Sequence, residues 1–251
     1  MHRNSCPSRQ SIGGIETCNP TGGLQWLVSV RDLVEAEQTR AFGVDILDLK
    51  EPHLGALAPV SAGLWRDVIH WSQEQSDGRQ SVPLLSAALG EPQQAISVAH
   101  QLPREFSFAK VGPSGCTTID QISAVWAQTR ARLPQTVELV AVAYADYQAA
   151  GTLPPEQILT AAASHGFRRI LLDTFSKRGR SAIDSLGAVG LAQFGRSALG
   201  HQLWWSLAGA IRLCHVRQIS TLFPDRTTAT DCIAFRGNVC HRDHQGALSN
   251  R

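Results

Sequence analysis

Lysine is rare in this chain and stands only where a buried strand is expected to end. Of the 23 Lys and Arg residues, only Lys50, Lys110 and Lys177 are lysine. Each follows a short apolar run directly or within a few residues. Unlike arginine, lysine can lose its proton when burial or a neighbouring cation lowers its pKa, and its neutral amine can form a Schiff base with a carbonyl group. These positions therefore predict amine chemistry on a carbonyl substrate.

Two aspartates accompany the lysines. Asp48 precedes Lys50 by two residues, so the alternation of side chains along a strand puts both on one face. Asp173 follows the apolar run 170–172 and stands four residues before Lys177. A second cation beside a partly desolvated lysine lowers its pKa toward roughly 7–8, which makes that lysine a nucleophile or a base. We expect the two carboxylates to shuttle protons and to stabilise an iminium ion.

The elements that must position these residues alternate along the chain. Apolar runs typical of strands buried on both faces are followed by segments with helical spacing, on a period of roughly 30 residues. This alternation predicts an α/β fold with a parallel sheet and right-handed crossovers. We predict strands at 25–30, 46–49, 83–87, 106–111, 138–143, 169–173, 203–207 and 232–235, and helices at 31–42, 62–74, 90–100, 118–133, 154–165, 182–198 and 215–223.

Eight such units in one domain favour a closed TIM (β/α)8 barrel over an open sheet, and 251 residues are enough for it. No GxGxxG motif follows the first strand, which disfavours a dinucleotide-binding fold. We expect the barrel to occupy residues 24–242, with a short or missing last helix. A disordered extension at 1–23 would precede it and a tail at 243–251 would follow.

Composition narrows the class of partner. A net charge of +2 gives no electrostatic reason to bind nucleic acid or an anionic membrane. No apolar run approaches the roughly 20 residues of a membrane span. Six scattered cysteines without a CxxC pair argue against a zinc site or a disulfide framework. We therefore expect a cytoplasmic protein with no bound metal and no cofactor, whose partner is a small molecule.

In barrels of this kind the site lies at the carboxyl ends of the strands, where side chains from alternate strands share a layer. We expect Lys50, Lys110 and Asp173, from the second, fourth and sixth strands, to share one layer. Asp48 would lie one layer lower, and Lys177 could swing over the site from the loop after the sixth strand. Two ammonium groups and two carboxylates would then meet at one barrel mouth.

Phosphate binding is expected in the loops after the last two strands, where barrels often hold phosphate on backbone amides. One loop contains Gly209 and Ala210, and the other begins with Arg236 and Gly237. Glycine lets the backbone approach an anion, and an arginine adds charge-assisted hydrogen bonds. Asp146, in a polar loop after the fifth strand, is a further candidate for substrate binding, with a solvated loop aspartate as the alternative.

Taken together, the motifs of this chain resemble those of one enzyme family, the (5-formylfuran-3-yl)methyl phosphate synthases of methanofuran biosynthesis. Any one motif is common, but the set is specific and extends from about residue 24 to residue 242. The motifs, in order, are Leu27-Val28-Ser29, Asp48-Leu49-Lys50-Glu51-Pro52 with Gly55-Ala56-Leu57, Ser86-Ala87-Ala88-Leu89-Gly90, Lys110-Val111-Gly112, Tyr144-Ala145-Asp146, Leu172-Asp173-Thr174 with Lys177, Leu207-Ala208-Gly209, and Arg236-Gly237 with Cys240.

The resemblance implies a TIM barrel that condenses two glyceraldehyde 3-phosphate molecules into (5-formylfuran-3-yl)methyl phosphate, with loss of phosphate and water. It places the family's Schiff-base lysine on Lys50 and its proton-accepting lysine on Lys110. The family's further catalytic residues fall on Asp48, Asp173 and Lys177. The family is known in methanogens and in bacteria with a methanofuran-linked one-carbon pathway. The implied partner is a small phosphorylated aldehyde, and a homo-oligomer is one option for the assembled state.

The chain departs from the family pattern in both expected phosphate loops. Ala210 stands where the family usually has serine, and Asn238-Val239-Cys240 stands where it tends to have Ala-Ala-Cys. Two alternatives to furan synthesis stay open at this point. One is another class I aldolase, which forms a Schiff base on the same barrel but uses other aldehydes. The other is a non-catalytic barrel that binds a phosphorylated metabolite.

Overall fold

The computed structural model describes residues 24–40, 42–75, 82–176 and 179–212, the single residues 215, 218, 219 and 222, and the strand at 232–236. The expected N-terminal extension, the C-terminal tail and any last helix lie outside these residues. Lys177 and Gly237 also lie outside them. Only separate positions of the helix expected at 215–223 are described.

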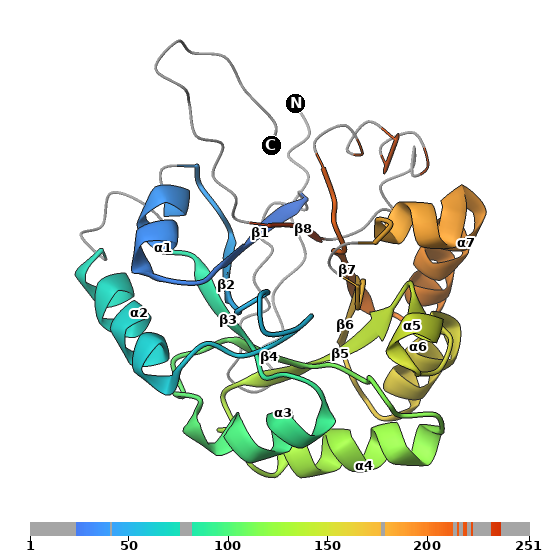
Figure 1. Ribbon diagram of the computed structural model, residues 1–251, viewed down its shortest axis with the longest axis horizontal. Coiled ribbons are helices and arrows are strands. Elements are labelled where there is room, and N and C mark those ends of the chain that lie inside the picture. The colour runs from blue at the N-terminus through green and yellow to red at the C-terminus, as the bar shows by residue number, and fades with distance from the viewer. Residues whose placement is uncertain are drawn as a thin grey trace, which may run out of the picture.

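In the described part of the chain, eight parallel strands close into a barrel in the order in which they occur in the sequence (Figure 1). The last strand closes it by pairing with the first and with the seventh. The TIM barrel predicted from the alternation is thus confirmed. The strands are β1 (Gln25–Val30), β2 (Ile46–Leu49), β3 (Leu84–Ala88), β4 (Phe108–Val111), β5 (Glu138–Tyr144), β6 (Arg169–Asp173), β7 (Trp204–Leu207) and β8 (Cys232–Arg236).

The helices lie outside the ring of strands (Figure 1). One of them, α5, is a single turn in a segment that the sequence analysis took for a loop, because four residues are too short to show a helical period. Within the described ranges the helices are α1 (Leu33–Arg40), α2 (Ala62–Glu74), α3 (Pro92–Val98), α4 (Ile119–Arg130), α5 (Tyr147–Ala150), α6 (Pro155–Ser164) and α7 (Ala182–Gly200), with a 3₁₀ turn at Ala99–Gln101 after α3.

Capping boxes explain where two of these helices begin. The Thr118 hydroxyl accepts a hydrogen bond from Gln121 N, and the Gln121 side chain accepts one from Thr118 N, which forms a capping box at α4. Ser181 and Asp184 form the same arrangement at α7. Gly187, with φ 68° and ψ 171°, kinks α7 near its start. The cap at Ser181 determines where the loop after β6 ends.

Apolar side chains form two separate layers because both faces of the strands are covered. Outward residues such as Leu49 pack against buried helical residues such as Trp65. Inward residues such as Val142 and Leu171 belong to a second cluster inside the barrel. Burial on both faces is the reason that the strands read as continuous apolar runs in the sequence.

A stacked arginine lies at the amino-terminal end of the barrel. The Arg169 guanidinium lies 5.0 Å from the ring centroids of both Phe108 and Trp204. Arg169 Nη1 also lies 2.6 Å from Glu138 Oε2. All four residues stand at or near the start of a strand.

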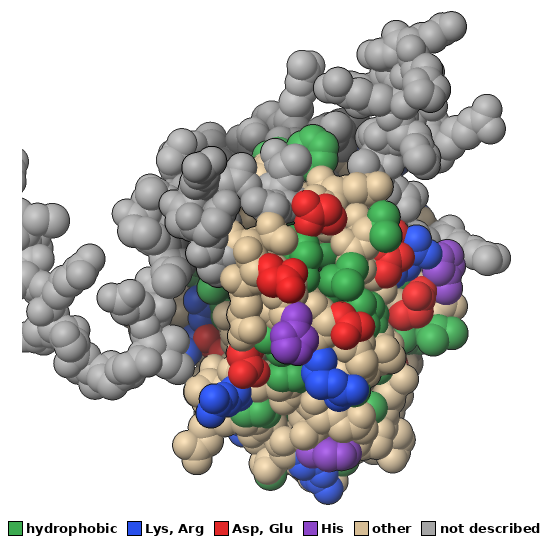
Figure 2. Space-filling view, turned by 90° about the vertical axis from the view of Figure 1, so that its left-hand side faces the viewer, with side chains coloured by type: hydrophobic (Ala, Val, Ile, Leu, Met, Phe, Trp, Pro, Cys, Tyr) green, Lys and Arg blue, Asp and Glu red, His purple; other side chains and the backbone are tan. Residues whose placement is uncertain are grey.

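The outer face of α1 and α2 is mixed in charge and also carries apolar side chains, of which Val34 on α1 is exposed. Asp32, Glu37, Arg66 and Asp67 are exposed there, and red, blue and purple side chains are interspersed on this side of the molecule (Figure 2). Trp71 Nε1 donates to Glu37 Oε2 at 2.5 Å, which ties the two helices together. None of the helices in the described ranges is both long and apolar enough to cross a membrane.

Candidate active site

Two lysine–aspartate pairs occupy the carboxyl end of the barrel interior. Lys110 Nζ, on β4, lies 2.5 Å from Asp48 Oδ1, on β2. Lys50 Nζ, directly after β2, lies 3.9 Å from Asp173 Oδ2, at the end of β6. The structure thus brings together four of the residues that the sequence analysis singled out.

The pairing corrects the expected layering of these side chains. Asp48 is in register with Ser86, and Ser86 with Phe108. Because the strands of an eight-stranded barrel are tilted, residues at the same height along the barrel axis are offset from residues in register by about one residue per strand. Two strands after Asp48 the offset is about two residues, so the residue of β4 at the height of Asp48 is Lys110 and not Phe108. Lys110 is therefore level with Asp48 and one layer below Lys50. The expectation that Lys50, Lys110 and Asp173 share a layer is wrong for Lys110.

The two pairs differ in their contact with solvent. The side chains of Lys110 and Asp48 are 5% and 0% exposed, whereas that of Lys50 is 12% exposed. Asp48 Oδ2 also accepts a hydrogen bond from Ser29 Oγ at 3.1 Å. The lower pair is therefore enclosed by the barrel, and Lys50 is the amine that a ligand in the mouth can reach.

Burial lowers the pKa of Lys110. Desolvation is the largest cause, the charge of Asp48 opposes it, and the nearby Lys50 cation lowers the pKa further. A buried amine whose pKa is lowered in this way gives up and takes back a proton more readily than a surface lysine does. This property suits a proton acceptor.

Two carboxylates organise the loop after β6. Asp173 Oδ1 accepts from Thr174 N at 2.7 Å. Asp146 Oδ1 accepts from Phe175 N at 2.7 Å, and its Oδ2 accepts from Ser176 N at 2.9 Å. Asp146 therefore anchors the segment that leads to the third lysine. The structure thus shows Asp146 in contact with the backbone of the loop after β6. Its expected part in substrate binding stays a prediction.

The sequence analysis missed two residues at the mouth, Glu91 and Tyr144. Tyr144 is fully buried, and its hydroxyl donates to Glu91 Oε1 at 2.6 Å. Burial raises the pKa of Tyr144 well above its usual value, and the charge of Glu91 raises it further. The fifth strand extends to Tyr144, one residue beyond the predicted end at Ala143, and Glu91 lies in the segment predicted as the start of a helix. A side-chain alternation carried one residue further would have pointed Tyr144 into the barrel.

The comparison with known protein families identifies the family to which this chain belongs. The family model described as 4-HFC-P synthase matches residues 26–251. The chain belongs to the 4-HFC-P synthase family. The family resemblance drawn from the motifs is thereby confirmed, and the chain is an enzyme of this family.

Individual relatives agree with this assignment. The (5-formylfuran-3-yl)methyl phosphate synthase of Methanothermobacter thermautotrophicus is 28% identical over 221 residues, which cover 85% of this chain and 88% of that protein. The enzyme of the same name from Methanosarcina acetivorans is 26% identical over 233 residues, covering 90% and 94%. The similarity therefore extends over nearly the whole barrel.

Solved structures agree on the fold. The (S)-3-O-geranylgeranylglyceryl phosphate synthase of Thermoplasma acidophilum matches with a TM-score of 0.56 and 11% identity over 90% of each chain. The copper homeostasis protein CutC of Streptococcus agalactiae matches with a TM-score of 0.60 and 11% identity, over 86% of this chain and all of that one. At this level of identity the likeness shows the barrel fold alone.

The expected phosphate loops of this 4-HFC-P synthase family member are only partly described. A Cβ added to Gly209 would lie 2.8 Å from Thr174 Cγ2 and 2.9 Å from Thr174 N, and the φ of Gly209 is 88°. Glycine is thus needed there for the end of β7 to pack against the end of β6. Ala210 follows with φ 53° and is exposed. The backbone of Arg236 is in register with Ser29, and nothing further of the β8 loop is described.

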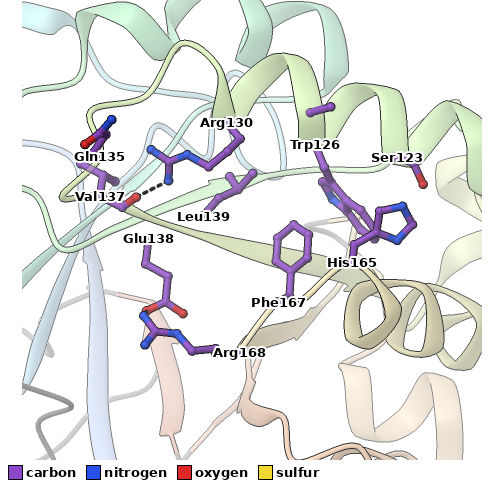
Figure 3. Close-up of a pocket in the computed structure, with 12 residues that line it drawn as sticks. Ser123, Trp126, Arg130, Gln135, Val137, Glu138, Leu139, His165, Phe167 and Arg168 are labelled. Atoms are coloured by element: carbon purple, nitrogen blue, oxygen red, sulfur yellow. Dashed lines mark hydrogen bonds and ion pairs between the residues drawn. The ribbon is translucent and has the colours of Figure 1, made fainter. Parts of the chain in front are cut away.

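A separate surface pocket of about 440 Å³ lies away from the lysines, between α4, α6 and the starts of β5 and β6 (Figure 3). Trp126 and Phe167, with ring centroids 4.6 Å apart, contribute its aromatic wall. The two arginines that line the pocket already bind other groups of the chain. Arg130 donates to three backbone carbonyls of the following loop, and Arg168 pairs with Glu138. The groups suited to carbonyl chemistry are those at the opposite end of the barrel.

Proposed function

We propose that this member of the 4-HFC-P synthase family condenses two molecules of glyceraldehyde 3-phosphate through a Schiff base on Lys50. The product is (5-formylfuran-3-yl)methyl phosphate, and loss of one inorganic phosphate and two waters balances the atoms. The observation that carries the proposal is the pair of lysines in one barrel mouth, each against its own carboxylate and each with a different access to solvent.

Lys50 is assigned as the nucleophile because of its position. It is the more exposed of the two described lysines, and its nearest carboxylate oxygen is 3.9 Å away, compared with 2.5 Å for Lys110. Its neutral amine would add to the aldehyde carbon of the first triose phosphate, and loss of water would give an iminium ion. The negative charge of Asp173, whose Oδ2 lies 3.9 Å from Lys50 Nζ, would stabilise that cation.

Lys110 is assigned as the proton acceptor because burial lowers its pKa. The iminium ion acidifies the proton on C2 of the bound triose, and Lys110 would remove it to leave an enamine. The electron pair of the enamine then expels phosphate as the C3–O bond breaks. Asp48, at 2.5 Å, would stabilise Lys110 once it carries the proton.

The remaining steps join the second triose phosphate to the bound fragment. A carbon–carbon bond joins the two trioses, and the furan ring closes with loss of two waters. Hydrolysis of the iminium ion then frees the aldehyde product and consumes the water that was released when the iminium ion formed. Lys177, from the loop after β6, would serve this stage together with Asp146, which follows β5 and holds that loop. The phosphate that is retained would bind at Gly209 and Ala210 after β7, and at Arg236 and Gly237 after β8.

The scheme uses only side chains of this chain, with no metal ion and no organic cofactor. The expected partner is a small phosphorylated aldehyde, and we place the reaction in the cytoplasm, in methanofuran biosynthesis for one-carbon metabolism.

Reductive trapping tests the assignment. Borohydride added with glyceraldehyde 3-phosphate should leave one mass adduct, and peptide mapping should place it on Lys50. An adduct on another lysine, or no adduct, would contradict the proposal. Incubation with glyceraldehyde 3-phosphate alone should yield a furan chromophore, which another class I aldolase would not form.

A further inference from the structure

A serine hydroxyl contacts the buried pair of Lys110 and Asp48. Ser29, on β1, is in register with Asp48 on β2, and its Oγ donates to Asp48 Oδ2 at 3.1 Å. Leu27 and Ile46 belong to the apolar cluster inside the barrel, so Ser29 and Asp48, two residues further along each strand, also face inward. The serine is 7% exposed and the aspartate 0%. This hydrogen bond is therefore shielded from competing water.

The hydrogen bond divides the two oxygens of Asp48 between two partners. Oδ2 accepts from Ser29, and Oδ1 lies 2.5 Å from Lys110 Nζ. Asp173 is held in the same way, because its Oδ1 accepts from the next backbone N–H at 2.7 Å and its Oδ2 lies 3.9 Å from Lys50 Nζ. In both pairs a neighbouring group binds one carboxylate oxygen, and the other oxygen faces the lysine.

Asp48 has a second lysine within reach. Lys50 follows it by two residues, on the same face and at a Cα separation of about 7 Å. Burial is the main cause that lowers the pKa of Lys110, and the Lys50 cation lowers it further, so the two ammonium groups are close enough to compete for one carboxylate. A carboxylate without the hydroxyl could turn toward Lys50. Ser29 opposes this rotation, because its buried hydroxyl would lose its acceptor.

We propose that Ser29 is a positioning residue for proton removal, which holds Asp48 against Lys110 and away from Lys50. Lys110 becomes an ammonium ion when it takes the C2 proton of the bound triose, and Asp48 then stabilises that charge without having to move. Lys50 keeps Asp173 as the counter-charge of its iminium ion. This role rests on the proposed Schiff base at Lys50 and deepens it, because it assigns each carboxylate to one step.

The test compares Ser29→Ala with the wild type on glyceraldehyde 3-phosphate. Without the hydroxyl, Asp48 is free to leave Lys110, so kcat for furan formation should fall by roughly 10- to 100-fold, the value of one hydrogen bond to a charged group. KM should stay within about twofold, and borohydride should still trap the aldehyde on Lys50, because the nucleophile is unchanged. An unchanged kcat, or a raised KM at unchanged kcat, overturns the role of Ser29 while the Schiff base stands.

Deuterium at C2 of the substrate identifies the step that Ser29 assists. A C–D bond breaks more slowly than a C–H bond, so a variant slowed in proton removal should show an isotope effect on kcat at least as large as that of the wild type. A slow Ser29→Ala variant with a smaller isotope effect contradicts the proposal. Ser29→Thr keeps the hydroxyl and should bring kcat to within about threefold of the wild type. A threonine variant as slow as Ser29→Ala contradicts a role for the hydroxyl.

Ser206→Ala is the matched control for the loss of a buried hydroxyl. Ser206 is 9% exposed and lies on β7, in register with Leu171 of the cluster inside the barrel. The control should leave kcat and KM unchanged, and a loss as large as that in Ser29→Ala would overturn the specific role of Ser29. Absence of trapping in the wild type contradicts the Schiff base at Lys50, and with it the role of Ser29.

Discussion

Lys110 Nζ lies 2.5 Å from Asp48 Oδ1 inside the barrel, with both side chains almost completely removed from solvent. Two opposite charges in such a place stabilise each other, but each would be costly to leave without its partner. The stability of the barrel around this pair therefore depends on the protonation state of Lys110, the lysine that we assign as the base.

Removing the carboxylate from this pair should destabilise the protein. Asp48→Asn leaves the ammonium group of Lys110 in the barrel without its counter-charge, and we expect the free energy of unfolding at pH 7 to fall by about 3 kcal/mol. Urea denaturation measures it. The double variant Asp48→Asn/Lys110→Met removes both charges and should recover most of the loss. A double variant as unstable as the single one would contradict the coupling.

The lowered pKa of Lys110 predicts how stability depends on pH. Below the folded-state pKa both states carry the proton and the buried charge is a cost to the folded state. As pH rises through that pKa toward the ordinary value of 10.5, the folded state releases its proton first, so its stability rises. The free energy of unfolding of the wild type relative to Lys110→Met should therefore increase between neutral pH and about pH 10. A decrease over this range would mean that the pKa is raised.

Lys110→Met should also separate Schiff-base formation from later steps. Without the proton acceptor, turnover to the furan should fall by about 10³-fold, within the range known for loss of a general base. Lys50 is left in place, so borohydride should still trap the aldehyde on it. Loss of trapping in a folded Lys110→Met variant, judged by its circular dichroism, would contradict this division of roles.

Lys50→Arg tests whether Lys50 acts as a nucleophile or only binds the substrate. Arginine keeps the positive charge beside Asp173 but cannot form a Schiff base, so turnover and the trapped adduct should both disappear. Binding of the phosphorylated aldehyde, measured by calorimetry, should stay within about 10-fold because the charge is retained. The matched control is Arg66→Lys on the exposed face of α2, which should leave all three measurements unchanged.

Asp146→Asn tests the anchor of the loop after β6. The amide has one acceptor oxygen for the two N–H groups of Phe175 and Ser176, so the loop should loosen and KM should rise. Limited trypsin digestion should cut faster after Lys177, with Asp67→Asn on α2 as a control. Equal cleavage rates in Asp146→Asn and the wild type would contradict an anchoring role.

The sequence by itself determined the barrel and the identity of its central residues. Both faces of each strand are buried, so the strands appear as continuous apolar runs whose ends can be located, and Lys50, Lys110 and Asp173 stand at those ends. These are local properties of the chain. The family motifs lie at the same strand ends, which is why the motif-based assignment agreed with the family comparison.

Only the tertiary structure decided which of these groups meet. The tilt of the strands shifts each level along the barrel, and it therefore pairs Lys110 with Asp48 and Lys50 with Asp173 instead of collecting three residues in one layer. Glu91 reaches the mouth because Gly112, which directly follows β4, has no side chain to exclude its carboxylate. Contacts of this kind join residues more than 20 positions apart. They depend on how the closed barrel sets the distances between strands. The side-chain alternation along a single strand does not indicate those distances.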